Sequence, residues 1–197
     1  RVTVVEKADD QFFGAYMHNG GKISALVVLG GKENIEIYDA DIKGDLNTIA
    51  KNVKINEINL KGDFYSLVDD LSVNTSNDLH IGGIIGNMED YVENIKIVSA
   101  KNITNGLTAD DTNISAKNID LTAGDSIGED QALNMELAED NKINITAVNI
   151  ANLNNTGAKN NFDTVNANEV IINSDNDVNI ADLNADKLKL TTQSTNI

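Results

Sequence analysis

The feature of this sequence that most limits its fold is a short pattern that returns many times along the chain. One small or polar residue and two polar residues precede an apolar residue, any residue and a second apolar residue. Copies begin at Ala50, Ala100, Ala116, Asp140, Ala167 and Ala185. Strict alternation of apolar residues is typical of half-buried strands, because successive side chains of a strand point to opposite faces. Strands this short are not stable alone, so many of them must stack.

The spacing of the copies favours a solenoid. The last five copies begin 16, 24, 27 and 18 residues apart. Further alternating pairs lie between them, at Ile35/Ile37, Ile58/Leu60, Ile95/Ile97, Val148/Ile150 and Val178/Ile180. Hairpins favour Asn-Gly or Asp-Gly turns, and only Asn19-Gly20 and Asn105-Gly106 qualify. We therefore predict an all-β chain, a right-handed parallel β-helix with coils of about 20 residues.

Ten such coils, stacked about 4.8 Å apart, would make a rod of roughly 45 to 50 Å. The pentapeptide SAKNI occurs at residues 99–103 and 115–119, and we expect its two copies to stack, with Asn102 above Asn118. The residues expected at structural repeat positions are Ala100, Asn102, Ile103, Ala116, Asn118, Ile119, Leu121, Ile143, Ile145, Val170, Ile172, Val178, Ile180, Leu188 and Leu190.

One β-helical segment is expected over residues 1–197, with an irregular start at 1–33, less regular coils at 34–98 and regular coils at 99–197. Loop excursions are expected mainly in the first half, which holds seven of the eight Phe and Tyr residues. These aromatic side chains either cover the rod or form an exposed contact surface. The residues assigned to that surface are Phe12, Phe13, Tyr16, Phe64 and Tyr65.

Composition excludes several classes of function. A formal charge of −16 opposes binding to nucleic acid, and the one arginine is Arg1. The absence of cysteine excludes disulfides and thiol chemistry. The most apolar run, residues 23–29, is too short to cross a bilayer. The chain begins without Met and without a signal segment, so we expect an internal piece of a longer protein.

Few residues suggest catalysis or metal binding. His18 and His80 are the only histidines and lie beside glycine-rich turns, and no motif for a nucleophile, phosphate or zinc is present. We expect no enzyme activity and no cofactor. Asp175 and Asp177 begin like a calcium loop, but Ile180 occupies the position where the loop needs glycine. Asp39, Asp41 and Asp45 form a similar weak acidic group.

The segment NISAKNIDLTAGDSIGEDQALNMELAEDNKINITAVNIANL, residues 113–153, resembles the shaft repeats of filamentous-haemagglutinin-type exoproteins. It is closest to the leukotoxin-type filamentous adhesins of anaerobic bacteria such as fusobacteria. The resemblance is clear over residues 100–197, moderate over 34–63 and weak over the first thirty. It implies a secreted or surface-exposed virulence protein that is exported by an outer-membrane partner transporter in two-partner secretion and contacts host cells, leukocytes in particular.

These observations are compatible with three functions. The first is a shaft segment of such an adhesin or leukotoxin, expected to be monomeric and not to insert into membranes. The second is a carbohydrate-active β-helix, a polysaccharide lyase or hydrolase, which would gather acidic and lysine side chains in one lateral cleft. The third is a spacer of a phage fibre or surface layer, which predicts trimers or lattice contacts.

Overall fold

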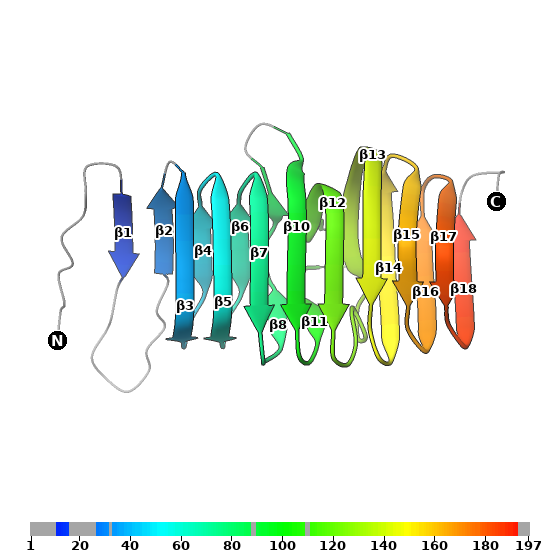
Figure 1. Cartoon of the computed structure of the whole chain (residues 1–197), viewed down its shortest axis with the longest axis horizontal. Helices are drawn as coiled ribbons and strands as arrows, with labels where there is room; N and C mark the ends of the chain where they lie inside the picture. Colours follow the sequence, from blue (N-terminus) through cyan, green and yellow to red (C-terminus); the bar gives the residue numbers. More distant parts are fainter. Residues whose placement is uncertain (1–10, 16–26, 32, 88–89, 109–110, 193–197) are drawn as a thin grey trace.

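The chain forms an all-β structure with most of its strands in one large parallel sheet (Figure 1). The computed structural model describes residues 11–15, 27–31, 33–87, 90–108 and 111–192. No helix occurs among these residues, and so none of them forms a helix able to cross a membrane. The prediction of an all-β chain is confirmed.

Two layers of strands face one another along the molecule (Figure 1). The front layer contains β3 (Asn34–Ile42), β5 (Asn52–Leu60), β7 (Asp70–Thr75), β10 (Val92–Ser99), β12 (Ile114–Ala123), β13 (Leu133–Thr146), β15 (Asn160–Asn166) and β17 (Val178–Asn184). The back layer contains β2 (Val27–Gly31), β4 (Leu46–Ile49), β6 (Phe64–Leu67), β9 (Ile85–Gly86), β14 (Ile150–Gly157), β16 (Glu169–Ser174) and β18 (Lys187–Thr192). The chain alternates between the layers, and the first halves of β12 and β13 pair with back-layer strands.

Parallel pairing is the rule throughout the described sheet. The exception is β1 (Gln11–Ala15), which pairs antiparallel with β2. A short third row joins β8 (Leu79–Ile81) to β11 (Ile103–Asn105), and Ile103, Ile127 and Ala151 continue that row as parallel bridges.

The chain returns to the same place in the front layer at intervals of 18 to 24 residues. Asn34 pairs with Asn52, and Asn52 with Asp70, 18 positions apart each time. The interval rises to 24 where Asp70 pairs with Asn94 and Asn94 with Asn118. It is again 18 between β15 and β17. The intervals are therefore near the predicted twenty, and the stretch from residue 34 to 70 is as regular as any later one.

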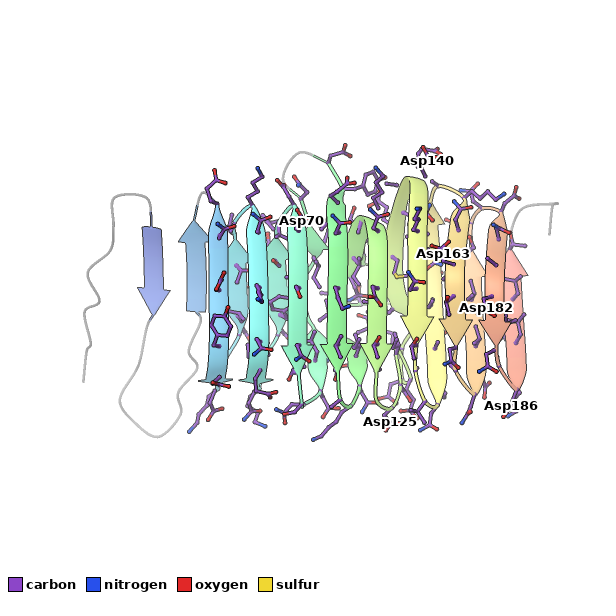
Figure 2. All side chains as sticks on the ribbon, in the orientation of Figure 1. Asp70, Asp125, Asp140, Asp163, Asp182 and Asp186 are labelled. Carbon is purple, nitrogen blue, oxygen red and sulfur yellow. The ribbon has the colours of Figure 1, made fainter. Side chains whose placement is uncertain are left out.

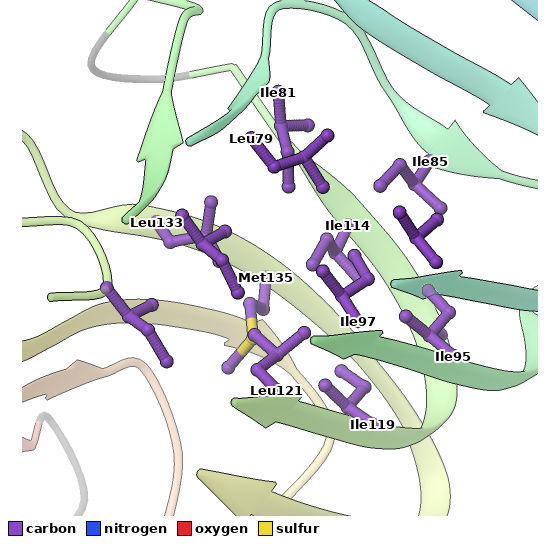
Figure 3. Packing of buried hydrophobic residues seen from close by; sticks show 14 of the residues in the cluster. Leu79, Ile81, Ile85, Ile95, Ile97, Ile114, Ile119, Leu121, Leu133 and Met135 are labelled. Carbon is purple, nitrogen blue, oxygen red and sulfur yellow. The ribbon is translucent and has the colours of Figure 1, made fainter. Parts of the chain in front are cut away.

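The core between the layers is a stack of branched aliphatic side chains (Figure 3). Ile95 lies beside Ile119 and Ile97 beside Leu121, and all four are at most 2% exposed. Each buried side chain of this size contributes about 1.5 to 3 kcal/mol relative to an exposed one. The alternation read from the sequence thus reflects one face turned into this core.

Most of the expected repeat positions are buried. Residues 0 or 1% exposed are Ile103, Ala116, Ile119, Leu121, Ile143, Ile145, Val170 and Ile172. Near the end of the stack the core is more open: Val178, Ile180 and Leu190 are only partly buried and Leu188 is 45% exposed. Val148, expected in a half-buried pair, is 56% exposed because it lies at a corner before β14.

The expected stacking of the two SAKNI copies is wrong. Ala116 lies beside Val92, and Asn118 beside Asn94, 24 positions earlier. The second copy runs through the middle of β12, whereas the first forms a corner in which Ala100 is exposed. The Ser99 hydroxyl accepts a hydrogen bond from the Lys101 amide at 3.1 Å and shapes that corner. Identical letters therefore take two conformations, because a 16-residue interval is too short to complete one return.

Candidate functional site

A groove crosses the outer face of the front layer. It has a volume of about 590 Å³. Its lining comes from seven neighbouring front-layer strands, β3, β5, β7, β10, β12, β13 and β15, and from none of the back layer. A cavity between the layers would touch both, so this groove lies on the outside of the sheet and runs across the strands.

The floor and walls follow from strand alternation. Ile35, Val53, Leu71, Ile95 and Ile119 occupy one row across the sheet and point inward, so that their backbone forms the floor. The rows one residue before and one residue after point outward and form the two walls. The first wall comprises Asn34, Asn52, Asp70, Asn94, Asn118 and Lys142, and the second Glu36, Lys54, Ser72, Lys96, Asp120 and Asn144.

The first wall is ordered by a ladder of side-chain hydrogen bonds. Asn52 Nδ2 donates to Asn34 Oδ1 at 2.8 Å. Asn94 Nδ2 donates to Asp70 Oδ1 at 2.6 Å, and Asn118 Nδ2 donates to Asn94 Oδ1 at 3.0 Å. Each link joins residues 18 or 24 apart, so the ladder fixes the register of the strands as well as the wall.

The second wall carries more charge. Lys96 Nζ lies 3.5 Å from Asp120 Oδ2, with both side chains about half exposed. At the β3 end, the Tyr38 hydroxyl donates to Glu36 Oε2 at 2.6 Å, and this hydrogen bond to a carboxylate raises the pKa of Tyr38 above its ordinary value. Asp163 on β15 lies at the far end of the groove; Asp70 and Asp163 are labelled in Figure 2. The outward side chains of the groove therefore carry charges of both signs.

A second polar cluster surrounds His80, which lies in β8 just before the glycines at 82 and 83. His80 Nδ1 is 2.7 Å from the Thr104 hydroxyl, and Nε2 is 3.7 Å from Asp63 Oδ1. The side chains of His80 and Asp63 are each about half exposed. The Asp63 distance is too long for the hydrogen bond that orients a catalytic histidine. This cluster lacks the geometry of a nucleophilic triad. His18 lies outside the described residues.

A corner before β8 is stabilised electrostatically. Partial burial raises the pKa of the Asp78 carboxyl, but hydrogen bonds from the side chain and backbone of Asn102 outweigh this effect, so that the pKa is lowered. Asn102 Nδ2 donates to Asp78 Oδ1 at 2.9 Å and its amide donates to the same atom at 3.1 Å. Asn102 is thus a repeat position, as expected, but its neighbour in the stack is Asp78.

Only two residues of the predicted aromatic surface, Phe64 and Tyr65, have described side chains. Phe64 is fully buried in the core, because β6 turns it inward, so its assignment to an exposed surface is wrong. Tyr65, the next residue, is half-buried on the opposite face. Phe12 and Phe13 lie in β1, and their side chains, like Tyr16, lie outside the described part of the chain.

In the described part of the chain, no three His, Asp or Glu side chains come together as metal ligands, and this holds for the acidic groups noted in the sequence. Residues 175–177 form the corner between β16 and β17. Asp41 Oδ1 accepts a hydrogen bond from Asn59 at 3.1 Å, and Asp45 Oδ1 accepts one from the Asp63 amide at 2.9 Å. These carboxylates connect successive returns of the chain.

Sequence reasoning missed the groove residues. Lys54, Lys96 and Asp120 were read only as the polar positions of alternating strands. The signal was available in principle, since polar residues at intervals of 18 or 24 form both walls, but it becomes visible only when the register is known.

Comparison with known proteins shows no family. Neither a known protein family nor a solved structure matches the chain. A stretch of 39 residues is 56% identical to elongation factor Ts of Lactiplantibacillus plantarum, covering 20% of this chain and 13% of that protein. A stretch of 36 residues is 58% identical to elongation factor Ts of Streptococcus mutans, covering 18% and 10%. The chain spans only about a tenth to an eighth of these relatives, too little to carry over their activity.

Proposed function

We propose that this chain is a structural and host-contact segment, a piece of the shaft of a secreted bacterial adhesin or leukotoxin of the filamentous-haemagglutinin type. The observation that carries the proposal is the parallel stacking of strands, in which the chain returns to the front layer every 18 to 24 residues. Such stacking lengthens a protein by local contacts alone, so it suits an extended filament.

The finer fold assigned to this shaft is a right-handed parallel β-helix. Alternation between front and back layers with parallel pairing in both supports a chain that winds continuously, and crossovers between parallel strands are right-handed in nearly all known sheets. The buried residues Thr48 and Ser66, whose side-chain oxygens are 2.8 Å apart, lie at equivalent positions of successive coils.

Export and partners follow from the same assignment. The full-length protein would leave the cell through an outer-membrane partner transporter, and the folded segment would act at the cell surface or beyond it. A surface of mostly polar side chains with a net charge of −16 favours a soluble monomer that does not enter membranes and does not bind nucleic acid. We assign it no catalytic activity and no cofactor.

The fold is testable by cross-linking, because the chain has no native cysteine. Asn34 and Asn52 are paired across β3 and β5, so the double variant Asn34→Cys/Asn52→Cys should form an intramolecular disulfide under mild oxidation. The control Asn34→Cys/Asn94→Cys places the thiols three strands apart, about 14 Å, and should not. Equal cross-linking of the two variants would refute the register.

The host-contact role is testable with cells. The fluorescently labelled chain should bind leukocytes saturably and bind epithelial cells less, and an excess of unlabelled chain should displace it. Equal, non-saturable binding to both cell types would reduce the segment to a spacer. Light scattering separates the monomer expected here from the trimer expected of a phage-fibre spacer.

Carbohydrate recognition is the second candidate, and one observation favours it. Lysine and acidic side chains converge in a single lateral groove of the front layer, as expected for a carbohydrate-active β-helix. No aromatic side chain is among the residues that line this groove, so the geometry favours binding through hydrogen bonds and charge over stacking.

A further inference from the structure

The groove on the front layer carries charges of alternating sign. From β3 to β15, each strand contributes one charged lining residue, in the order Glu36, Lys54, Asp70, Lys96, Asp120, Lys142 and Asp163. On the six strands from β3 to β13, the second outward lining residue is an uncharged hydrogen-bonding group, asparagine or serine. Along the groove the charge therefore changes sign at each strand, with Asp70 and Lys142 on the first wall and the other charged residues of β3 to β12 on the second.

Internal pairing accounts for only part of this pattern. Lys96 and Asp120 form the one ion pair within 4.0 Å among the charged groove residues that the structure describes. Lys54 and Lys142 are exposed and have no carboxylate within that distance among the described residues. Opposite charges on neighbouring strands do stabilise a sheet, and Glu36 and Asp70 each accept a hydrogen bond from a neighbouring side chain, but the lysines at both ends of the row remain available to a ligand.

The spacing of the charges selects the kind of ligand. Neighbouring strands are about 4.8 Å apart, so charges of the same sign recur about every 9.6 Å along a groove of roughly 29 Å. Side chains on one face of an extended peptide recur at about 6.6 to 6.8 Å, which loses register with the groove after one or two steps. A sugar ring with its glycosidic oxygen advances by about one strand spacing, and the C–H face of its chair can lie over a floor of backbone.

We infer that the groove binds a linear polysaccharide whose successive sugars alternate between an ammonium and a carboxylate group. Each lysine would face a carboxylate sugar and each acidic residue an amino sugar, while Asn94, Asn118 and their equivalents would bond ring hydroxyls. A purely anionic polymer is disfavoured, because the groove holds four carboxylates to three ammonium groups and the whole chain carries −16. The inference goes beyond the shaft role, since a chain that binds no leukocytes can still bind this polymer.

Isothermal titration calorimetry at low salt tests the inference. The probe is an oligosaccharide of N-deacetylated hyaluronan, in which glucuronate and glucosamine alternate. We expect it to bind, and to bind at least about tenfold more tightly than the acetylated parent, which lacks the ammonium groups; tenfold corresponds to about 1.4 kcal/mol. Binding should weaken as salt screens the charges.

A charge swap tests whether binding depends on the order of the charges along the groove and not only on their number. The variant Lys96→Asp/Asp120→Lys keeps the net charge and allows the ion pair to re-form, but it breaks the alternation. The control Glu93→Lys/Lys117→Glu swaps an ion pair of 3.3 Å on the same two strands, β10 and β12, outside the groove. We expect the first swap to lower the affinity for the polymer about tenfold and the control swap to leave this affinity unchanged. The two variants should have equal thermal unfolding midpoints.

Three results would overturn the inference. The first is no binding of the alternating polymer, or binding no tighter than that of the acetylated parent. The second is an equal loss of affinity in both swaps. The third is tighter binding of an extended peptide of alternating lysine and glutamate, which would assign the groove to a protein partner. The titration uses no cells, so its outcome is independent of the leukocyte test.

Discussion

Replacing Thr48 by valine should destabilise the chain, although the two side chains have nearly the same shape. The Thr48 and Ser66 hydroxyls lie 2.8 Å apart in the back layer, and both residues are 0% exposed. Each is the other's only side-chain partner in the described structure. Thr48→Val therefore leaves a buried Ser66 hydroxyl unpaired, which costs about 1 to 3 kcal/mol. Ser66→Ala should cost a similar amount, because it leaves the buried Thr48 hydroxyl without its hydrogen-bond partner.

The double variant Thr48→Val/Ser66→Ala removes both polar groups, so it should be nearly as stable as the parent, within about 1 kcal/mol. The coupling between the two sites is then at least about 1 kcal/mol, above the few tenths found for independent sites. Urea unfolding followed by far-ultraviolet circular dichroism measures all four proteins. A double variant as unstable as the sum of the two singles would refute the reasoning.

Three further perturbations test other parts of the structure. The pKa of Asp78 is lowered in the folded chain, so its contribution to stability is present above the ordinary carboxyl pKa near 4 and is lost as the pH falls through the lowered value. When urea unfolding is repeated at decreasing pH, Asp78→Asn should therefore lose less stability than the parent. Gly157 has φ of 87° and an added Cβ would lie 2.6 Å from a backbone oxygen, so Gly157→Ala should lower the free energy of unfolding by about 1 to 3 kcal/mol. In the control Gly86→Ala the new Cβ would meet only a side chain at 3.4 Å, so the free energy of unfolding should change by less than about 1 kcal/mol. Equal losses in the two variants would contradict the strain argument. Phe64→Ala should cost about 3 to 5 kcal/mol of unfolding free energy by leaving a cavity, and Tyr65→Ala should cost much less, as measured by urea unfolding. A larger loss for Tyr65→Ala would contradict the burial of Phe64.

The strand content and the inward positions were predictable from the sequence. Ile119 and Leu121 alternate with polar residues, and a period of two is a local property of a strand that needs no knowledge of its neighbours. Both residues are buried as expected. Leu188 follows the same local pattern but is 45% exposed, because burial also needs a neighbouring strand on each side, and β18 pairs only with β16 in the described sheet.

The register was not predictable, because it depends on how many residues each corner uses. The two SAKNI copies show this, since Ser99 ends a strand and caps a corner while Ser115 lies inside β12. The groove was missed for the same reason. Lys96 and Asp120 are 24 positions apart in the sequence and 3.5 Å apart in space, and no local pattern connects them.

The row formed by β8, β11 and the bridges at Ile127 has a consequence for how such a chain changes length during evolution. The interval grows from 18 to 24 where this row begins, and Leu79, Ile103, Ile127 and Ala151 then follow one another 24 positions apart. Six residues inserted into a single return would leave a strand with no partner on either side. Duplication or loss of a complete 24-residue unit keeps every row intact. Length variants of this chain should therefore differ by whole returns, with short insertions confined to the corners.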